Sequence, residues 1–417
     1  MKKYFSKRIL AVFLLGFSSG LPLALVGSLL SAWFKTSGLN IVSIGCLTLI
    51  GQPYVYKFLW APLLDRFQSP FYKLLDHRRG WILSAQILIV LIIIIMSTLD
   101  PKTSPLLLGF CGLLLAFSSS TQDIVIDAYR VNMLSAEERG LGAALAIEGY
   151  RIAMIVSGSF GLILADNFGW QATYLIMGSL MLLGIIAVCL LAPSVESIGN
   201  KHQDFNLKTI VWQPLENFFT KDQAIWLLAL MIFYKIGDVC SQSLVTPFLL
   251  DLDFSLTAVG TITKFIGMVA SLIGIMCGGI IMTKLNLFRS LLTFGVLQGI
   301  SNLLFMLLAI IGKNYYIAIA AFFIENLCSG MGNTALVVLL MSLCSKEYSA
   351  TQYALFSSLT AIGRVYIGPI AGLLVKTLGW QWFYLFSSSL AIPGILLILF
   401  LKRHIIMHDN RKASLAL

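Results

Sequence analysis

The stretch Gly169-Trp170-Gln171, followed by Tyr174-Leu175, recurs 210 residues later as Gly379-Trp380-Gln381 and Tyr384-Leu385. The same shift, half the length of the 417-residue chain, superposes further residues in one register without a gap. These are Ser135-x-Glu137 on Ser345-x-Glu347, Ala144 on Ala354, and Gly158 on Gly368. The repeat predicts two halves that share one architecture and one orientation.

The composition places both halves in a membrane. Hydrophobic residues make up 58% of the chain and charged residues 12%, which is more apolar surface than one soluble core hides. A helix of about 20 apolar residues crosses about 30 Å of hydrocarbon. The sequence therefore predicts an all-α membrane protein with twelve transmembrane helices, near 9–34, 41–64, 81–99, 105–129, 141–165, 171–192, 223–248, 256–283, 290–312, 316–343, 350–376 and 380–401.

Twelve helices in two parallel six-helix halves form the repeat of the major facilitator fold, with the substrate cavity expected between the halves at mid-membrane. We expect an N-terminal half over 1–192, a cytoplasmic connector over 193–222, a C-terminal half over 223–401, and a cytoplasmic tail over 402–417.

The basic residues indicate the orientation. With both termini in the cytoplasm, twenty of the 29 lysines and arginines fall in inner loops and tails and four in outer loops, as the positive-inside rule requires. This asymmetry explains the net charge of +10 better than nucleic-acid binding does. The basic start before the first apolar stretch also resembles a secretory signal peptide, but that stretch exceeds the usual 7–15 residues, which favours a permanent span.

Charged side chains inside the predicted spans are the candidate functional residues. A carboxylate at bilayer depth costs roughly 2.5–3.5 kcal/mol on insertion scales, so it persists facing a wet cavity or a partner. Lys235 and Asp238 are three residues apart on one helix, as are Glu148 and Arg151, which is close enough to pair. The alternative is that each acid only neutralises a base for packing. The acids are Asp123, Asp127, Glu148, Asp238 and Glu325, and the bases are Lys57, Arg151, Lys235, Lys264 and Arg364.

Two kinds of chemistry suit these charges. An ion pair that separates between two conformations changes its proton affinity, and so couples protons to motion. Arginine or lysine facing the cavity could instead hold a substrate carboxylate. The four histidines fall outside the predicted spans and the seven cysteines lack metal-ligand spacing, so the sequence predicts carboxylates as proton carriers and neither a metal nor a cofactor.

A second motif resembles one that major facilitators carry in the loop after their second span. Asp65-Arg66, followed by Arg78-Arg79, matches its Asp-Arg and Arg-Arg elements, although the glycine that opens the motif is replaced by Ala61. We expect these four residues to form a charge clasp that is made and broken as the halves rock.

Several longer motifs together resemble the AmpG-type muropeptide permeases. They are 121–130, reading Thr-Gln-Asp-Ile-Val-Ile-Asp-Ala-Tyr-Arg, together with 16–22, 57–66, 234–238, 330–332 and 349–354. The resemblance implies an importer that carries muropeptides together with protons across the lipid bilayer of the bacterial inner membrane. We expect the importer to be a monomer. Larger family members carry extra hydrophobic segments in the middle or at the end, and this chain has neither. We expect its substrate range to be narrowed or altered relative to theirs. The residues proposed for substrate binding or proton coupling are Gln122, Asp123, Asp127, Tyr129, Glu148, Arg151, Lys235, Asp238, Glu325, Gln352 and Arg364.

Other functions remain open at this point. Another anionic solute, such as an acetyl-CoA-like compound or a peptide, would suit the same charges. Asp123 and Asp127 superficially resemble the paired aspartates of an intramembrane protease, but two residues on one helix four positions apart diverge from the geometry that activates one water. A membrane enzyme also leaves the 210-residue repeat without an explanation, and no loop is long enough for a receptor's output domain.

Overall fold

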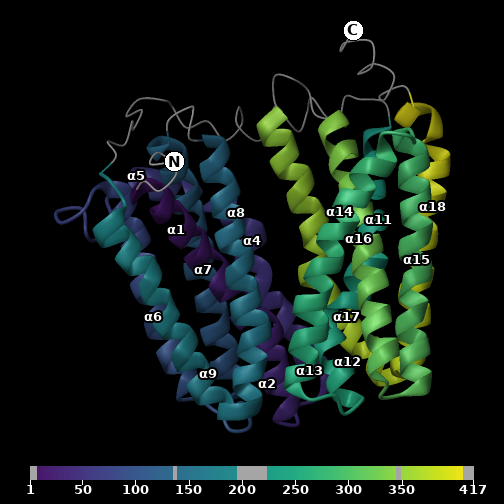
Figure 1. The fold of residues 1–417 in the computed structure, drawn as a ribbon, viewed down its shortest axis with the longest axis horizontal. Coiled ribbons are helices and arrows are strands. Elements are labelled where there is room, and N and C mark those ends of the chain that lie inside the picture. The colour runs from purple at the N-terminus through teal and green to yellow at the C-terminus, as the bar shows by residue number, and fades with distance from the viewer. Residues whose placement is uncertain (1–6, 135–138, 195–222, 344–348, 407–417) are drawn as a thin grey trace. The chain divides into compact units, whose positions relative to one another are not determined.

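A computed structural model describes residues 7–134, 139–194, 223–343 and 349–406, and within these ranges every regular element is a helix (Figure 1). The chain divides into two compact units. The first comprises Met1–His202 with Ser255–Thr261, and the second comprises Gln203–Phe254 with Ile262–Leu417. The connector and tail expected at 193–222 and 402–417 lie largely outside the described residues.

The helices before the connector belong to the first unit. Several are interrupted by short turns of different pitch, labelled η. In chain order they are α1 (Lys7–Ala24), η1 (Leu25–Leu29), α2 (Leu30–Thr36), α3 (Ile41–Cys46), η2 (Leu47–Gly51), α4 (Gln52–Tyr56), η3 (Lys57–Leu59), α5 (Ala61–Arg66), α6 (His77–Ser97), α7 (Pro105–Met133), α8 (Arg139–Ile155), η4 (Val156–Phe160), α9 (Gly161–Ile186) and η5 (Ala187–Leu191).

The helices after the connector follow the same order of long spans. They are α11 (Ala224–Ser243), α12 (Val245–Asp251), α13 (Leu256–Gly260), η7 (Thr261–Ile266), α14 (Gly267–Met282), α15 (Leu287–Ile311), α16 (Tyr315–Leu343), α17 (Ser349–Ser389) and α18 (Ala391–Phe400). The turns η1, η4, η5 and η7 are π-helical; η1, η4 and η7 lie inside continuous spans, and η5 ends one.

The expected twelve spans are present among the described residues. Nine helical stretches there are long and apolar enough to cross a membrane, and Ile41–Tyr56 is a shorter apolar one. Two of the nine, Leu145–Leu191 and Ile362–Phe400, each contain one glycine with non-helical backbone, Gly169 and Gly379. Dividing both stretches at these glycines and adding the shorter helix accounts for every predicted span. The all-helical membrane fold is confirmed.

The repeated Gly-Trp-Gln motif forms the same corner in both units. Gly169 has φ 78° and ψ 170°, and Gly379 has φ 79° and ψ 170°. The following tryptophan donates its indole N–H to the end of the unit's first span in each case. Trp170 Nε1 donates to Thr36 Oγ1 at 3.1 Å, and Trp380 Nε1 donates to Asp251 Oδ2 at 3.0 Å. The motif therefore ends the fifth span of each unit and ties the corner to the first.

The repeat also fixes where the third span of each unit begins. Asp76 caps α6 by accepting a hydrogen bond from the backbone N–H of Arg79 at 3.0 Å. Asn286, 210 residues later, caps α15 by accepting from the backbone N–H of Arg289 at 2.9 Å. Both side chains satisfy an amide that the first turn of a helix leaves unpaired.

Closely packed glycines hold α1 against α8 in the first unit. A Cβ on Gly16 would lie 2.3 Å from the carbonyl oxygen of Ala146, and one on Gly20 would lie 2.5 Å from that of Tyr150. Small residues four apart let two membrane helices approach at backbone distance. In the second unit Gly274, beside the Leu327 carbonyl, brings α14 against α16 in the same way.

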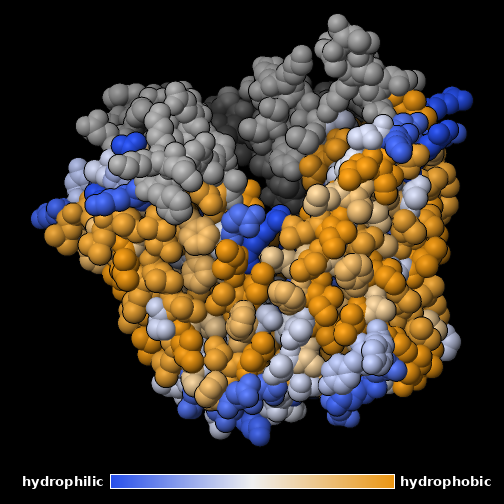
Figure 2. Space-filling view, viewed as in Figure 1, coloured by the Kyte–Doolittle hydropathy of each residue, from blue (hydrophilic) through white to orange (hydrophobic). Residues whose placement is uncertain are grey.

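Apolar side chains cover the outer faces of both units. Exposed leucine, isoleucine and methionine residues follow α6 and α14, including Leu91, Ile95, Met276 and Ile280. Figure 2 shows the apolar surface on this face of each unit, with hydrophilic residues gathered toward the helix ends. Together with the candidate spans, this surface identifies a multi-pass membrane protein.

We predict that alanine at Gly169 or Gly379 destabilises the protein. The observed φ and ψ lie in a region that is essentially restricted to glycine, and a residue held there costs about 1–3 kcal/mol. Thermal unfolding of the purified variants in detergent would measure the loss. The matched control is Gly109→Ala on α7, where an added Cβ meets no atom within 4 Å and the glycine is helical. Equal unfolding temperatures for Gly379→Ala and Gly109→Ala would contradict the prediction.

Candidate functional site

The first unit places Asp123 at a contact between two spans. Ser19 on α1 donates a hydrogen bond from its hydroxyl to Asp123 Oδ1 on α7. Asp123 is only partly exposed. A hydroxyl donor stabilises an ionised carboxylate, so the contact with Ser19 gives Asp123 a hydrogen-bond partner on another span.

The neighbour of Asp123 is a buried glutamine. Gln122 is fully buried, and neither its amide nitrogen nor its amide oxygen has a hydrogen-bond partner among the described residues. The preceding Thr121 is engaged, since its hydroxyl accepts from the indole N–H of Trp60 at 3.1 Å. Unpaired buried amides cost free energy, so both amide atoms of Gln122 are open to a further hydrogen-bond partner.

Asp127 has a different environment, although it lies only one turn further along α7. Its carboxylate pairs with Arg130 at 3.0 Å, and its side chain is 57% exposed. Exposed ion pairs contribute little to stability, so the pair is free to open. The predicted motif thus contains one partly buried and one exposed acid.

Tyr129 and Arg79 both hold the end of the sixth span. The Tyr129 side chain is fully buried and donates its hydroxyl to the carbonyl oxygen of Pro193 at 2.6 Å. Arg79 donates to the carbonyl oxygen of Ala192 at 2.9 Å and pairs with Asp76 at 2.6 Å. A cation at a helix C-terminus stabilises the unpaired carbonyls there. These observed contacts anchor a helix end.

The clasp and one site residue are described only in part. The side chains of Asp65, Arg66 and Gln352 lie outside the described residues, although their backbones lie on α5 and α17. Arg78 is partly buried in the first turn of α6, beside Arg79.

The second unit gathers three buried charged side chains. The Lys235 ammonium group pairs with Asp238 Oδ2, as the three-residue spacing predicts. Ser329 on α16 bridges the two, because its hydroxyl accepts from Lys235 Nζ at 3.3 Å and donates to Asp238 Oδ2 at 2.8 Å. Lys235 is 9% exposed, so the pair is shielded from solvent. The local pairing of Lys235 with Asp238 is confirmed.

Glu325 completes this cluster from α16. Its side chain is 1% exposed, and Gln242 Nε2 on α11 donates to its Oε2. The carboxyl group of Glu325 lies close to that of Asp238. Glu325 Oε1 has no donor among the described residues. A proton on either carboxyl group would supply the missing donor.

Among the described residues, no ion pair joins Glu148, Arg151 or Arg364 to these two clusters. Glu148 and Arg364 are exposed and Arg151 is partly exposed. Glu148 and Arg151 form no ion pair in the described structure, although their spacing equals that of Asp238 and Lys235. Ser329 bridges the Lys235–Asp238 pair from a neighbouring helix, whereas nothing described bridges Glu148 and Arg151.

Sequence reasoning missed three polar partners, Ser19, Ser329 and Gln242. Ser19 lies in the motif of residues 16–22, so that motif carried a signal. Gln242 follows Asp238 by four residues on α11, which places both on one helix face. Ser329 had no distinguishing pattern, because its contact depends on how α11 and α16 pack.

Comparisons with known proteins identify the family. The model of the Major Facilitator Superfamily matches residues 8–368. The anhydromuropeptide permease of Escherichia coli (strain K12) is 46% identical over 388 residues, covering 93% of this chain and 78% of that protein. This chain belongs to the anhydromuropeptide permease family of the major facilitator superfamily. A putative transporter, AmpG 4, of Rickettsia felis is 34% identical over 95% of this chain and 97% of its own length.

Solved transporters share the fold at low sequence identity. A mutant of the nucleoside transporter NupG aligns with a TM-score of 0.74 at 14% identity, over 94% of this chain and 98% of that one. A mutant of the peptide transporter POT aligns with a TM-score of 0.74 at 12% identity, over 96% and 95%. The chain is accordingly a transporter of the permease family, and the enzyme interpretation is set aside.

We predict that cysteines at positions 123 and 127 react with a small water-soluble thiol reagent. In a background without the seven native cysteines, Asp127→Cys should react fastest because Asp127 is exposed. Asp123→Cys should react more slowly yet measurably. Val125→Cys, at a fully buried position between them, serves as the unreactive control. The interpretation that these acids face water is wrong if position 123 is as protected as position 125.

We also predict that Lys235→Met destabilises the protein strongly. Removing one partner of a buried ion pair costs about 3–5 kcal/mol, because the remaining charge is left without compensation. The double variant Lys235→Met/Asp238→Asn should recover part of this loss. The control is Arg130→Met, which breaks an exposed pair worth roughly 0–1 kcal/mol. Thermal unfolding in detergent compares the three, and similar losses for Lys235→Met and Arg130→Met would refute the prediction.

Proposed function

We propose that this transporter imports anhydromuropeptides, the glycopeptide fragments of cell-wall turnover, across the bacterial inner membrane together with protons. The main support for this proposal is the 46% identity with a named anhydromuropeptide permease over 93% of the chain. The buried Lys235–Asp238–Glu325 cluster adds a physical basis for coupling, because buried charges in membrane helices typically mark ion or substrate paths.

The substrate side of the proposal rests on complementary chemistry. Muropeptides carry several carboxylates and sugar hydroxyls. Arg151 and Arg364 are accessible cations suited to carboxylates, since a guanidinium group binds them bidentately. The amide of Gln122, which has no partner among the described residues, offers both a donor and an acceptor for a hydroxyl. Glu148 and Gln352 remain proposed substrate-binding or proton-coupling residues.

The proton-coupling part of the proposal rests on the acidic residues in the spans. Lys235 is already paired with Asp238, so in this arrangement it holds no substrate carboxylate. We therefore assign Lys235 to proton coupling. Sharing a proton between Asp238 and Glu325 lets the pair load and release it as the distance to Lys235 changes. Asp123, which accepts a hydrogen bond from Ser19, and the exposed Asp127 are the candidate carriers of the first unit.

The orientation and assembly are proposed on the charge distribution. The excess of lysine and arginine in the expected inner loops supports cytoplasmic termini, and we propose that the transporter works as a monomer. The clasp of Asp65, Arg66, Arg78 and Arg79 is proposed to stabilise one conformation at the cytoplasmic ends of the helices.

We predict that amide variants of the proton carrier uncouple transport. Labelled anhydromuropeptide should accumulate in right-side-out vesicles only with an inward proton gradient. Four variants each place a neutral amide at one candidate position. They are Asp238→Asn, Glu325→Gln, Asp123→Asn and Asp127→Asn. The variant at the true carrier should lose accumulation yet keep exchange of substrate across the membrane, because exchange requires the alternation of access without proton release.

The control is Asp253→Asn, the same chemical change at an exposed residue between α12 and α13. It should accumulate substrate normally. Proton coupling through these residues is refuted if all four amide variants still accumulate substrate against its gradient. Uptake of an unrelated anionic solute or of a free peptide, without uptake of the muropeptide, would overturn the proposed substrate.

A further inference from the structure

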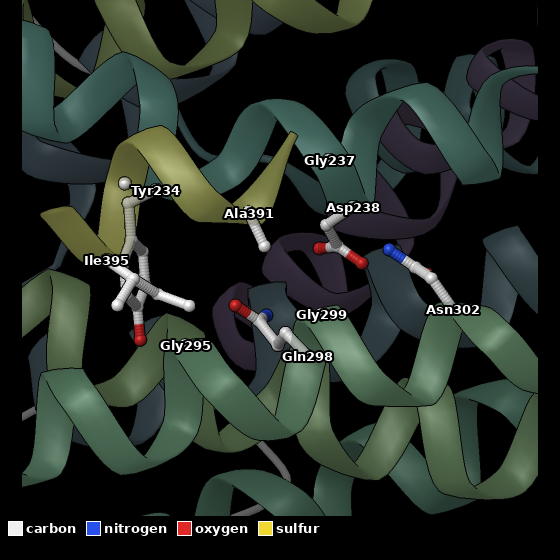
Figure 3. Close-up of a pocket in the computed structure, with 10 residues that line it drawn as sticks. Tyr234, Gly237, Asp238, Gly295, Gln298, Gly299, Asn302, Ala391 and Ile395 are labelled. Atoms are coloured by element: carbon white, nitrogen blue, oxygen red, sulfur yellow. The ribbon is translucent and has the colours of Figure 1, made fainter. Parts of the chain in front are cut away.

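A small cavity lies beside the charged cluster inside the second unit. It has a volume of about 10 Å³ and is lined by residues of α11, α15 and α18, namely Tyr234, Gly237, Asp238, Gly295, Gln298, Gly299, Asn302, Ala391, Gly394 and Ile395. Figure 3 shows the side chains of Gln298 and Asn302 extending from α15 toward Asp238 on α11.

The cavity exists because the surrounding helices contribute few side chains there. Four of its lining residues are glycines, and one is alanine. A Cβ on Gly299 would lie 2.9 Å from the Ala391 side chain, and one on Gly295 would lie 3.2 Å from the Tyr234 ring. The helices are therefore already in close contact around the cavity, and its small volume is set by backbone packing.

Two buried amides line this space without protein partners. Gln298 is 5% exposed and Asn302 is 2% exposed. Among the described residues, Gln298 Nε2, Gln298 Oε1 and Asn302 Oδ1 have no hydrogen-bond partner. Because both amide atoms of Gln298 lack a partner, this side chain is unpaired in either orientation of its amide. Leaving such groups unpaired costs about 1–3 kcal/mol each, so a ligand that satisfies them is strongly favoured.

The chemistry of the lining selects the ligand. A cavity of about 10–15 Å³ holds one water, and buried water typically makes about three hydrogen bonds. The lining offers a donor in Gln298 Nε2 and acceptors in Gln298 Oε1, Asn302 Oδ1 and the Asp238 carboxylate. Water both donates and accepts, whereas a bare cation of the same size would leave the Gln298 N–H unpaired. The adjacent Lys235 also neutralises Asp238, which disfavours a second cation.

We propose that this cavity is a binding site for one ordered water, which donates a hydrogen bond to Asp238 and is positioned by Gln298 and Asn302. Asp238 thereby gains a partner besides Lys235 and Ser329. Gln298 and Asn302 are positioning residues for the charged cluster, acting through the water. The proposal concerns occupancy of the cavity, so it stands or falls separately from the proposed function.

Hydroxyl-radical footprinting with mass spectrometry tests the site, because radiolysis of a bound water oxidises the side chains that touch it. Tyr234 lines the cavity and is buried. In the detergent-purified full chain, Tyr234 should be oxidised despite its burial. Tyr174, which is also buried and donates its hydroxyl to the Leu25 carbonyl, should remain unlabelled.

The variants Gln298→Leu and Asn302→Leu should each lose the labelling of Tyr234, and the use of two separate variants covers the failure of one to fold. The matched control is Gln86→Leu, a buried glutamine on α6 whose amide donates to the Ser18 hydroxyl at 3.2 Å. It should leave the labelling of Tyr234 unchanged.

Two results would overturn the proposal. One is an equal lack of oxidation at Tyr234 and Tyr174 in the wild type. The other is labelling of Tyr234 that falls when sodium chloride replaces choline chloride, because sodium rather than water would then occupy the cavity.

Discussion

The interior of a bilayer offers no water to a polar group, so a chain that crosses it must satisfy its own hydrogen bonds. Within the described residues this requirement is met by helices throughout. Where the backbone leaves the helical conformation, at Gly169 and Gly379, an adjacent indole N–H ties the corner to another span. Where charge enters a span, as at Lys235 and Asp238, a partner and a bridging hydroxyl accompany it.

The two halves share a scaffold but differ in their polar chemistry. The helix caps at Asp76 and Asn286 and the two glycine corners follow the 210-residue repeat. The charged cluster of Lys235, Asp238 and Glu325 does not, because the first unit has instead an aspartate held by Ser19. The repeat therefore extends to the framework of the two units and not to their charged side chains.

The fold was predictable because its signals are periodic and local. Span length, the repeat and the excess of basic loop residues depend on the sequence alone. The Lys235–Asp238 pair was predictable for the same reason, since both residues lie on one helix. The equally spaced Glu148 and Arg151 do not pair, which shows that spacing permits an ion pair without requiring one. The contacts of Glu325 with Gln242 and of Asp123 with Ser19 join residues 83 and 104 positions apart, and helix packing decides them.

The π-helical turns η1, η4 and η7 affect how any of these spans is mapped. A π-helical turn inserts one residue into the 3.6-residue cycle, which rotates all later side chains by about 100°. A helical wheel drawn straight through Leu25–Leu29 or Thr261–Ile266 therefore assigns later residues to the wrong face. Cysteine or tryptophan scans of α2 and α14 need a phase that restarts after the turn, and periodicity in such data would break at the same positions.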